Sequence, residues 1–265
     1  MKAVINVIKE QIENFYLIFR LASYDIKGRY QSHYLGVAWQ FINPAMQIII
    51  YWLVFGLGIR SGHPIGSTPF FVYMILGAIP WFFISSAIIQ GSNSVYNKVS
   101  LVSKMKFPVS VLPSITIVSN IFNLIFMLLI LGVILYVYRI NPGIYLLQLP
   151  YFILCMVIFL FAVTLLFSTI ATMARDFQLA LQSFMRMMIY VLPVLWDMEK
   201  LSLLNFFRLN PLYYLIDGFR KTFLVKEWFF HDWKYMLYFW IITLLMLFIG
   251  SIVHIRFRKQ FVDYI

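Results

Sequence analysis

Long apolar runs without charged residues are the main feature of the chain. A bilayer core of about 30 Å requires roughly 20 apolar residues per helix. Five runs meet this requirement, and each predicts a membrane-spanning helix: Gly36–Ile59, Thr68–Ile89, Val109–Tyr138, Leu146–Thr172 and Tyr235–Ile255. The last run contains no Asp, Glu, Lys or Arg, and His254 near its end is its only basic residue.

The stretch between the fourth and the last of these runs is less regular. Leu179–Trp196 is long enough to predict a sixth span, although it contains Arg186 and Pro193. Two further apolar segments, Leu201–Phe207 and Leu212–Phe223, are too short to cross a bilayer. Apolar segments of that length are typical of re-entrant or interfacial helices, so we expect two short helices dipping into the outer leaflet.

The first residues predict an amphipathic helix lying in the membrane interface. Apolar side chains share one helical face (Val4, Ile5, Ile8, Ile12, Phe15, Tyr16 and Phe19), and polar ones share the other (Asn6, Lys9, Glu10 and Glu13). An alternative is a helix packed on a partner protein. Charged residues interrupt what would be the apolar core of a signal peptide, so we expect the segment to be retained.

Composition places the whole chain in lipid. Of its 265 residues 62% are hydrophobic and 12% are charged, whereas about 25% are charged in soluble domains. The sequence therefore predicts an all-α integral membrane protein of one domain, residues 1–265. Within it we expect an interface and gate segment (1–34), a six-helix bundle (35–255) and a cytoplasmic tail (256–265).

The net charge of +11 is distributed as expected for a membrane protein, which argues against a nucleic-acid partner. Lys and Arg concentrate in segments 1–38, 91–108, 173–186 and 256–265, whereas the other short loops carry only Arg60 and Arg139. Positive residues favour the cytoplasmic side, so both termini are predicted to be cytoplasmic. The single cysteine, Cys155, lies in an apolar run and is expected to act as a small hydrophobic side chain.

Several motifs for catalysis are missing from the sequence. It contains no phosphate-loop pattern for ATP, no H-E-x-x-H, no Cys/His cluster and no nucleophile elbow. The five clear spans also contain no Asp or Glu, the residues with which proton-coupled transporters usually carry protons. We therefore expect no intrinsic catalytic site and no metal, and any transport would draw its energy from another chain.

Two cytoplasmic features are candidates for receiving that energy. Residues 98–108 predict a short basic helix that ends at Pro108, with Val102 and Met105 on one face for docking into a soluble partner. A basic interfacial loop held by headgroups is the alternative. The pair Arg175–Asp176 follows the fourth span, where a simple helix-end salt bridge is the alternative.

Aromatic and basic residues supply candidate substrate contacts. Tyr51, Trp52 and Phe55 lie near the middle of the first span, where their rings would suit sugar faces, although many such residues only anchor at interfaces. Lys27 and Arg29, followed by Tyr30, precede that span, and the two cations there can hold a phosphate or pyrophosphate. Ordinary anchoring to headgroups is an equal alternative for these cations.

Several of these motifs together resemble those of one family. The string Tyr24-Asp25-Ile26-Lys27-Gly28-Arg29-Tyr30, followed by Leu35-Gly36, Trp39 and Pro44, resembles the N-terminal signature of type-2 ABC exporter permeases for polysaccharides. Lys104-x-x-Phe107-Pro108 resembles the family's coupling loop, and Arg175–Asp176 its charged turn. Asn210-Pro211-Leu212-Tyr213-Tyr214 with Asp217 and Arg220 resembles its motif before the last span. The amino-acid sequence of the first string is most similar to that of teichoic-acid permeases of Gram-positive bacteria, although many relatives have Arg in place of Tyr24.

The resemblance implies a plasma-membrane homodimer that pairs with two copies of a separate ATPase, which would bind ATP and Mg²⁺. The lipid-linked glycan would be carried on undecaprenyl pyrophosphate. The implied coupling helix comprises Lys98, Leu101, Val102, Lys104, Met105, Lys106, Phe107 and Pro108. The implied inner gate contains Lys27, Arg29, Tyr30 and His33; the channel aromatics are Trp39, Tyr51, Trp52, Phe55, Tyr73 and Trp81. The implied outer gate contains Asn210, Pro211, Tyr213, Asp217 and Arg220.

Four other functions stay open at this point. O-antigen or capsule permeases share most of the motifs, and a drug or small-lipid permease would have the same fold. A membrane-embedded glycan polymerase or ligase would need acids at the outer surface, for which the sequence offers Asp197, Glu199, Asp217, Glu227 and Asp232. A non-catalytic scaffold has no specific support in the sequence.

Overall fold

The structure is a computed structural model that describes residues 2–30, 34–59, 62–98, 107–196, 204–258 and 260–261. Within these residues the chain forms eleven α-helices and no strand, apart from one isolated bridge between Ile65 and Thr68. The α-helices are α1 (Lys2–Glu13), α2 (Phe15–Tyr30), α3 (Trp39–Tyr51), α4 (Phe70–Ser92), α5 (Ser94–Asn97), α7 (Val111–Val137), α8 (Leu149–Met173), α9 (Arg175–Val191), α10 (Leu204–Arg208), α11 (Pro211–Leu224) and α12 (Trp233–Phe257). Short 3-10 turns, η1 (Gly36–Ala38) and η3 (Gly143–Gln148), precede α3 and α8, and a π-helical segment, η2 (Trp52–Ile59), follows α3.

Five helical segments are long and apolar enough to cross a membrane, and they match the five predicted runs. They are Phe41–Ile59, Phe70–Ser92, Val111–Val137, Gly143–Met173 and Trp233–Phe257. Their backbone groups bond within each helix, as a hydrocarbon environment demands. The prediction of an all-helical, multi-pass membrane protein is therefore confirmed.

The predicted sixth span differs from the observed helix in its limits. The sequence predicts a helix over Leu179–Trp196, whereas α9 runs from Arg175 to Val191. Pro193 explains the early end, because the residue before a proline is driven out of the helical region. Leu192 accordingly has extended backbone angles (φ −92°, ψ 159°). At 17 residues α9 is not among the five segments, so the sixth crossing stays a prediction.

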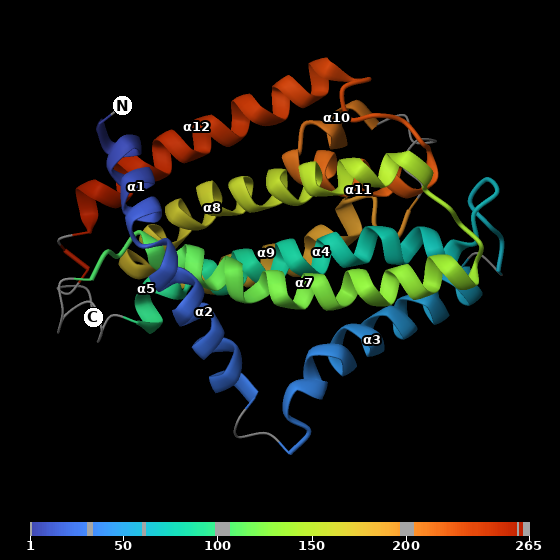
Figure 1. The fold of residues 1–265 in the computed structure, drawn as a ribbon, viewed down its shortest axis with the longest axis horizontal. Coiled ribbons are helices and arrows are strands. Elements are labelled where there is room, and N and C mark those ends of the chain that lie inside the picture. The colour runs from blue at the N-terminus through green and yellow to red at the C-terminus, as the bar shows by residue number, and fades with distance from the viewer. Residues whose placement is uncertain are drawn as a thin grey trace.

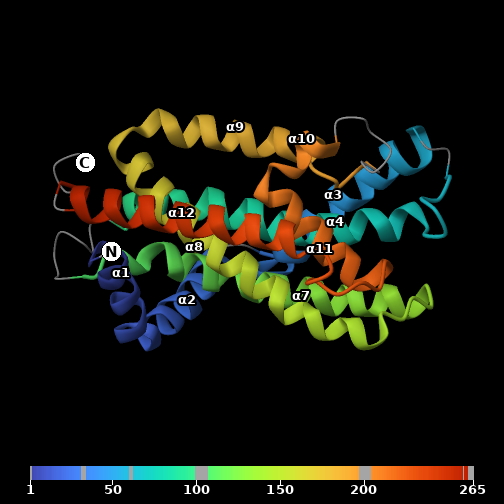
Figure 2. The same cartoon turned by 90° about the horizontal axis from the view of Figure 1, so that it is seen from above.

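Helix α4 is the centre of the bundle. In an apolar stretch of 18 residues within α4, 72% of the residues are buried, whereas 28% are buried in the corresponding stretches of α7 and α12. It packs against α7, α8, α11 and α9, while α8 and α12 lie side by side (Figure 1; Figure 2). Helix α3 diverges from this bundle, and in the corresponding stretch of the span Phe41–Ile59 only 11% of the residues are buried.

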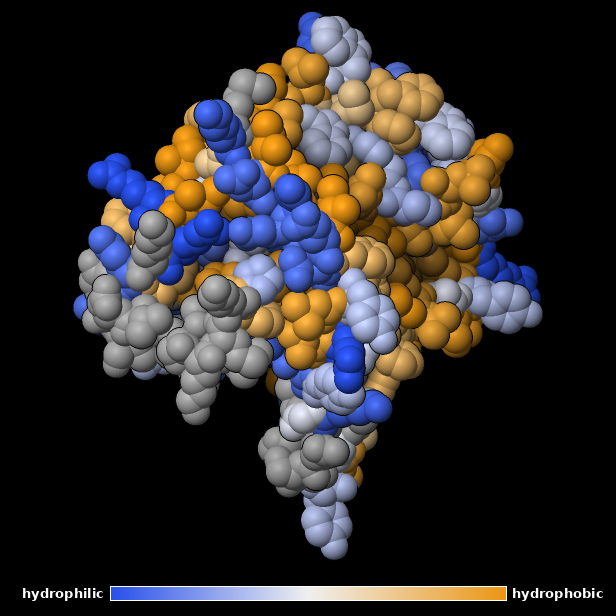
Figure 3. All heavy atoms as spheres, turned by 60° about the vertical axis from the view of Figure 1, so that its left-hand side comes forward, coloured by the Kyte–Doolittle hydropathy of each residue, from blue (hydrophilic) through white to orange (hydrophobic). Residues whose placement is uncertain are grey.

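The surface has the polarity expected of a protein surrounded by lipid. Apolar side chains are exposed along several spans, for example Leu129 and Val133 on α7 and Leu244 on α12. Hydrophilic side chains gather instead at the end of the molecule where α1 begins and α12 ends (Figure 1; Figure 3). The start of α1 and the end of α12 therefore lie on one side, as the predicted orientation requires, and which side is cytoplasmic stays a prediction.

The N-terminal segment is two helices rather than one. Asn14 separates α1 from α2, and its side-chain Nδ2 donates to the carbonyl of Glu10 (2.8 Å). The predicted apolar face is exposed at Ile5, Ile12 and Tyr16. Of the predicted polar face, Lys9 and Glu13 are exposed as well, and Glu10 points into the protein, where it bonds to Arg258. Exposed apolar side chains of this kind suit a helix that meets the membrane interface.

Candidate functional site

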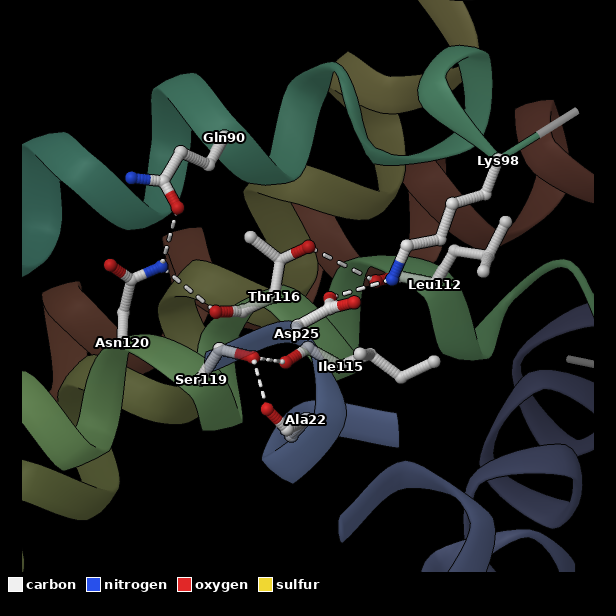
Figure 4. A network of polar contacts seen from close by, with 9 residues as sticks. All are labelled: Ala22, Asp25, Gln90, Lys98, Leu112, Ile115, Thr116, Ser119 and Asn120. Carbon is white, nitrogen blue, oxygen red and sulfur yellow. Dashed lines mark hydrogen bonds and ion pairs between the residues drawn. The ribbon is translucent and has the colours of Figure 1, made fainter. Parts of the chain in front are cut away.

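The predicted coupling segment is held at its first end by an ion pair. Lys98 Nζ lies 2.6 Å from Asp25 Oδ2 on α2, and both side chains are about a quarter exposed (22% and 27%) (Figure 4). Residues Leu101, Val102, Lys104, Met105 and Lys106 lie outside the described residues, so the predicted helix between Lys98 and Phe107 stays a prediction.

The other end of that segment is held by α1. Ser110 Oγ donates a hydrogen bond to a carboxylate oxygen of Glu10, and Gln11 Nε2 donates to the Ser110 carbonyl (3.1 Å). Glu10 also accepts from Arg258 Nη1 at the end of α12 (2.7 Å). Residues almost 250 positions apart are therefore joined beside the start of α7.

A small apolar cluster lies beneath these polar contacts. Its buried members come from α2, from α5, from α7 and the residues just before it, and from the segment after α12: Ile18, Ala22, Val95, Val109, Val111, Leu112, Ile115 and Phe261, with Phe107 packed against them. We call this cluster, together with the Asp25–Lys98 and Glu10–Ser110–Arg258 contacts, the N-terminal clamp. Because it joins both ends of residues 98–108 to α1 and α2, these elements are placed to move together.

The predicted inner gate is only partly visible. Lys27 is an exposed residue in the last turns of α2. Arg29 and Tyr30 end that helix, but their side chains lie outside what the structure describes, as does His33. Pyrophosphate binding at this position remains untested.

The predicted charged turn does separate two helices. Arg175 begins α9 two residues after α8 ends at Met173. Its guanidinium carbon lies 3.1 Å from the Tyr96 ring centre, and its Nη1 donates to Asn93 Oδ1 (3.4 Å). In the part of the chain that the structure describes, no ion pair joins it to Asp176, so the helix-end salt bridge is not formed.

The predicted channel aromatics lie in two different environments. Trp39, Tyr51, Trp52 and Phe55 are half-buried on α3 and η2, where Phe55 contacts the ring of Trp196 (centroids 5.4 Å apart). Tyr73 and Trp81 instead are buried on α4. A channel lining by these residues is untested, and for the last two the burial is equally consistent with core packing.

The predicted outer gate forms α11. Asn210 Oδ1 accepts from the backbone N–H of Leu212 (3.0 Å), and Pro211 occupies the first turn, where its missing N–H is not needed. Tyr213 is buried; burial raises the pKa of its phenol, and the nearby Asp217 carboxylate raises this pKa further. Asp217 pairs with Lys221 (3.0 Å).

Arg220 connects α11 to α4 and to the segment after α9. It is 4% exposed, and its Nη1 donates to the Tyr73 hydroxyl (2.8 Å). Nη2 donates to the carbonyl of Pro193, and the guanidinium carbon lies 3.7 Å from the Tyr73 ring centre. A carbonyl, a phenol and an aromatic face thus surround this buried cation.

Sequence reasoning missed a group of uncharged polar side chains inside the bundle. Ser86 and Gln90 on α4 and Asn120 on α7 bond to one another. Figure 4 shows the bond between Gln90 and Asn120. The candidate residues chosen from the sequence were mainly charged or aromatic. The helical spacing of these uncharged polar residues already indicated that they share a face.

Two of the acidic residues near the predicted outer surface have structural partners. The described residues hold no group of three or more His, Cys, Asp or Glu side chains that would suit a metal ion. Of the acids considered for a polymerase, Asp217 is paired with Lys221 and Asp232 caps α12 through the N–H of Tyr235. Asp197 and Glu199 lie outside the described residues.

A multi-pass helical bundle with its polar end clamped by the N-terminal helices defines a polytopic membrane protein. The sequence profile of the ABC-2 type transporter family matches residues 16–224, so this chain belongs to that family. The match confirms the family part of the resemblance drawn from the motifs.

Two relatives give a finer comparison. The O-antigen export system permease protein RfbA of Myxococcus xanthus is 26% identical over 226 residues, which cover 83% of this chain and 85% of the relative. A protein of the same description from Klebsiella pneumoniae is 29% identical over 215 residues, covering 79% and 81%.

Proposed function

We propose that this chain is the membrane permease of an ATP-driven exporter that moves a lipid-linked polysaccharide across the membrane. It works as a homodimer with two copies of a separate ATPase, which binds ATP and Mg²⁺. The relatives compared above are O-antigen export permeases, and no comparison supports teichoic acid. We therefore favour a glycan of the O-antigen type over the teichoic acid indicated by the N-terminal motif.

The observation that carries this proposal is the N-terminal clamp. A permease without a phosphate loop must receive the work of ATP binding through contact with another chain. Residues 98–108 are bracketed by Lys98 and Ser110, which bond to α2 and α1 respectively. A push on this segment is thereby delivered to the N-terminal helices and to the start of α7.

The remaining elements have roles that follow from their positions. The ATP-bound and nucleotide-free arrangements must differ in how they hold residues 98–108, because otherwise ATP could shift nothing. The bundle then rearranges as rigid bodies. Helices α1 and α2 form the inner, interfacial gate, α9 provides the sixth crossing, and α10 and α11 form the re-entrant outer gate.

A substitution in the coupling segment tests the proposal. Val102→Asp and Met105→Asp each put a carboxylate on the face that would dock into the ATPase. We expect export of the surface glycan to fall while membrane insertion and ATP hydrolysis persist, measured in cells lacking the native gene and on the purified complex. Normal export in both variants would remove the coupling assignment.

A matched control distinguishes coupling from general damage. Phe230→Asp puts the same charge on an exposed aromatic that lies just before α12, far along the chain from the coupling segment. We expect this variant to keep both export and hydrolysis. Active export by the permease without any nucleotide-hydrolysing partner would contradict the proposed function as a whole.

A further inference from the structure

Uncharged polar side chains follow one face of α4 and α5. Ser86, Gln90, Asn93 and Asn97 are spaced by four, three and four residues, which places them on one side of a helix. The neighbouring helices repeat the pattern with Thr116, Asn120 and Asn123 on α7, Gln178 and Gln182 on α9, and Asn43 and Gln47 on α3.

Hydrogen bonds connect these stripes where α4 faces α7. Ser86 Oγ donates to Asn120 Oδ1 (2.9 Å), and Asn120 Nδ2 donates to Gln90 Oε1 (3.2 Å). Gln90 Nε2 donates to Ser86 Oγ (2.7 Å). Gln90 and Asn120 point toward each other in Figure 4, with the Asp25–Lys98 pair beyond them.

Two cavities meet at this network. One, of about 330 Å³, is lined by α3, α4 and α7, including Gln47, Ser86 and Asn120. The other, of about 600 Å³, is lined by α2, α4, α5, α7 and α9, including Asn97 and Gln178. Both linings include Ile89 and Gln90, so the two spaces are adjacent there, and Phe82, Phe83 and Leu124 also line the first one. We call the uncharged polar side chains that line the two spaces the amide track.

The track carries almost no net charge. The described lining of the first cavity contains no Asp, Glu, Lys, Arg or His. The second contains Asp25 and Lys98, which neutralise each other at 2.6 Å. Amides can simply join helices within a membrane. Two features go beyond that role: Asn123 Oδ1 is buried without a hydrogen-bond partner at the first cavity, and Gln47 is exposed on α3 there.

We propose that this amide track holds an uncharged, hydroxyl-rich part of the transported chain, an inference that rests on the function proposed above. Each amide both donates and accepts hydrogen bonds, as sugar hydroxyls do, so neighbouring sugars can exchange partners along the stripe. A phosphodiester chain would enter this low-dielectric space without cations to balance it, which is strongly unfavourable. The substrate class is therefore a neutral glycan rather than a polyanionic one.

The test uses the purified permease–ATPase complex in proteoliposomes with two probes. Both carry the same polyprenyl-pyrophosphate anchor; one bears a neutral oligohexose and the other a poly(glycerol phosphate) of equal length. We expect ATP-dependent transfer of the neutral probe to be at least about tenfold faster, the equivalent of about 1.4 kcal/mol. Equal rates would overturn the inference and leave the proposed export function intact. Transfer of neither probe would contradict the proposed function, and the inference would fall with it.

Variants locate the effect in the track. We expect Gln90→Leu and Gln47→Leu to slow transfer of the neutral probe several-fold relative to the unaltered complex. Gln47 is exposed, so that variant carries little risk of misfolding. Gln47→Lys should raise the relative rate of the anionic probe. The control is Thr243→Val on α12, which removes a buried hydroxyl bonded only to its own helix (2.8 Å to the Phe239 carbonyl). Unchanged transfer in both Leu variants would overturn the assignment.

Discussion

Arg220 shows how one residue can join three elements of this bundle. A buried charge is costly unless it is hydrogen-bonded. Among the described residues Nη1 and Nη2 of Arg220 have acceptors, whereas its Nε has none. Here α4 supplies a phenol and an aromatic face, and the segment after α9 supplies a carbonyl. Tyr73 in turn donates to the Trp196 carbonyl (3.2 Å), which extends the contact along that segment. Arg220 therefore fixes the position of α11, the helix proposed as the outer gate.

Replacement of this arginine has a large expected effect on stability. In Arg220→Gln the Pro193 carbonyl and the Tyr73 hydroxyl lose a charged donor inside the bundle. We expect the free energy of unfolding to fall by about 2–4 kcal/mol, measured by thermal unfolding in detergent.

The control for that prediction is an arginine of the same short region. Arg208 lies 3.7 Å from Asp232, with both side chains more than a third exposed, so Arg208→Gln should lose less than about 1 kcal/mol. Equal losses in the two variants would show that Arg220 does not join the elements as described.

At the scale of elements, close helix contacts depend on small residues. A Cβ added at Gly77 on α4 would lie 2.5 Å from Arg220 Nη2 and 3.0 Å from the Cα of Val194. The second neighbour is backbone and cannot rotate away. Close approach through glycine is a common way for membrane helices to pack.

Two glycine substitutions test this packing. We expect Gly77→Ala to lower the free energy of unfolding by about 1–3 kcal/mol, because α4 must move away from residues 193–194. At Gly132 on α7 an added Cβ meets nothing within 4 Å, so Gly132→Ala should leave stability unchanged or raise it by up to about 1 kcal/mol. Thermal unfolding of both variants measures the difference, and similar behaviour of the two would contradict the contact.

The sequence was sufficient for elements whose cause is local. Runs of uncharged apolar residues located five spans, because a helix is the only simple way to satisfy backbone groups in lipid. The predicted end of α9 was wrong, because the apolar pattern continues past Pro193 whereas the helix ends at Val191. The partners of Arg220 lie 147 and 27 residues away, and no periodicity identifies such pairs. The amide track could not be predicted from the sequence, because its side chains come from separate helices that line two adjacent cavities.

At the scale of the whole molecule, the N-terminal clamp contains an ion pair that can transmit movement but contributes little to the stability of the fold. The Asp25–Lys98 pair is partly exposed, and such pairs contribute at most about 1 kcal/mol to folding. Losing it should therefore leave the bundle folded. Its position between α2 and the coupling segment makes it a connection through which displacement of that segment reaches the N-terminal helices.

Charge exchange across this pair tests the connection directly. We expect Asp25→Lys alone to reduce the amount of glycan exported per ATP hydrolysed, because two cations repel where α2 should follow residue 98. The double variant with Lys98→Asp restores opposite charges and should recover most of the export. The measurement is the ratio of transport to hydrolysis in proteoliposomes, with thermal unfolding as the control for folding. A double variant as impaired as the single one, with an unchanged unfolding temperature, would show that the N-terminal helices do not follow the coupling segment through this pair. The displacement would then have to reach the N-terminal helices through the contact between Glu10 and Ser110 alone.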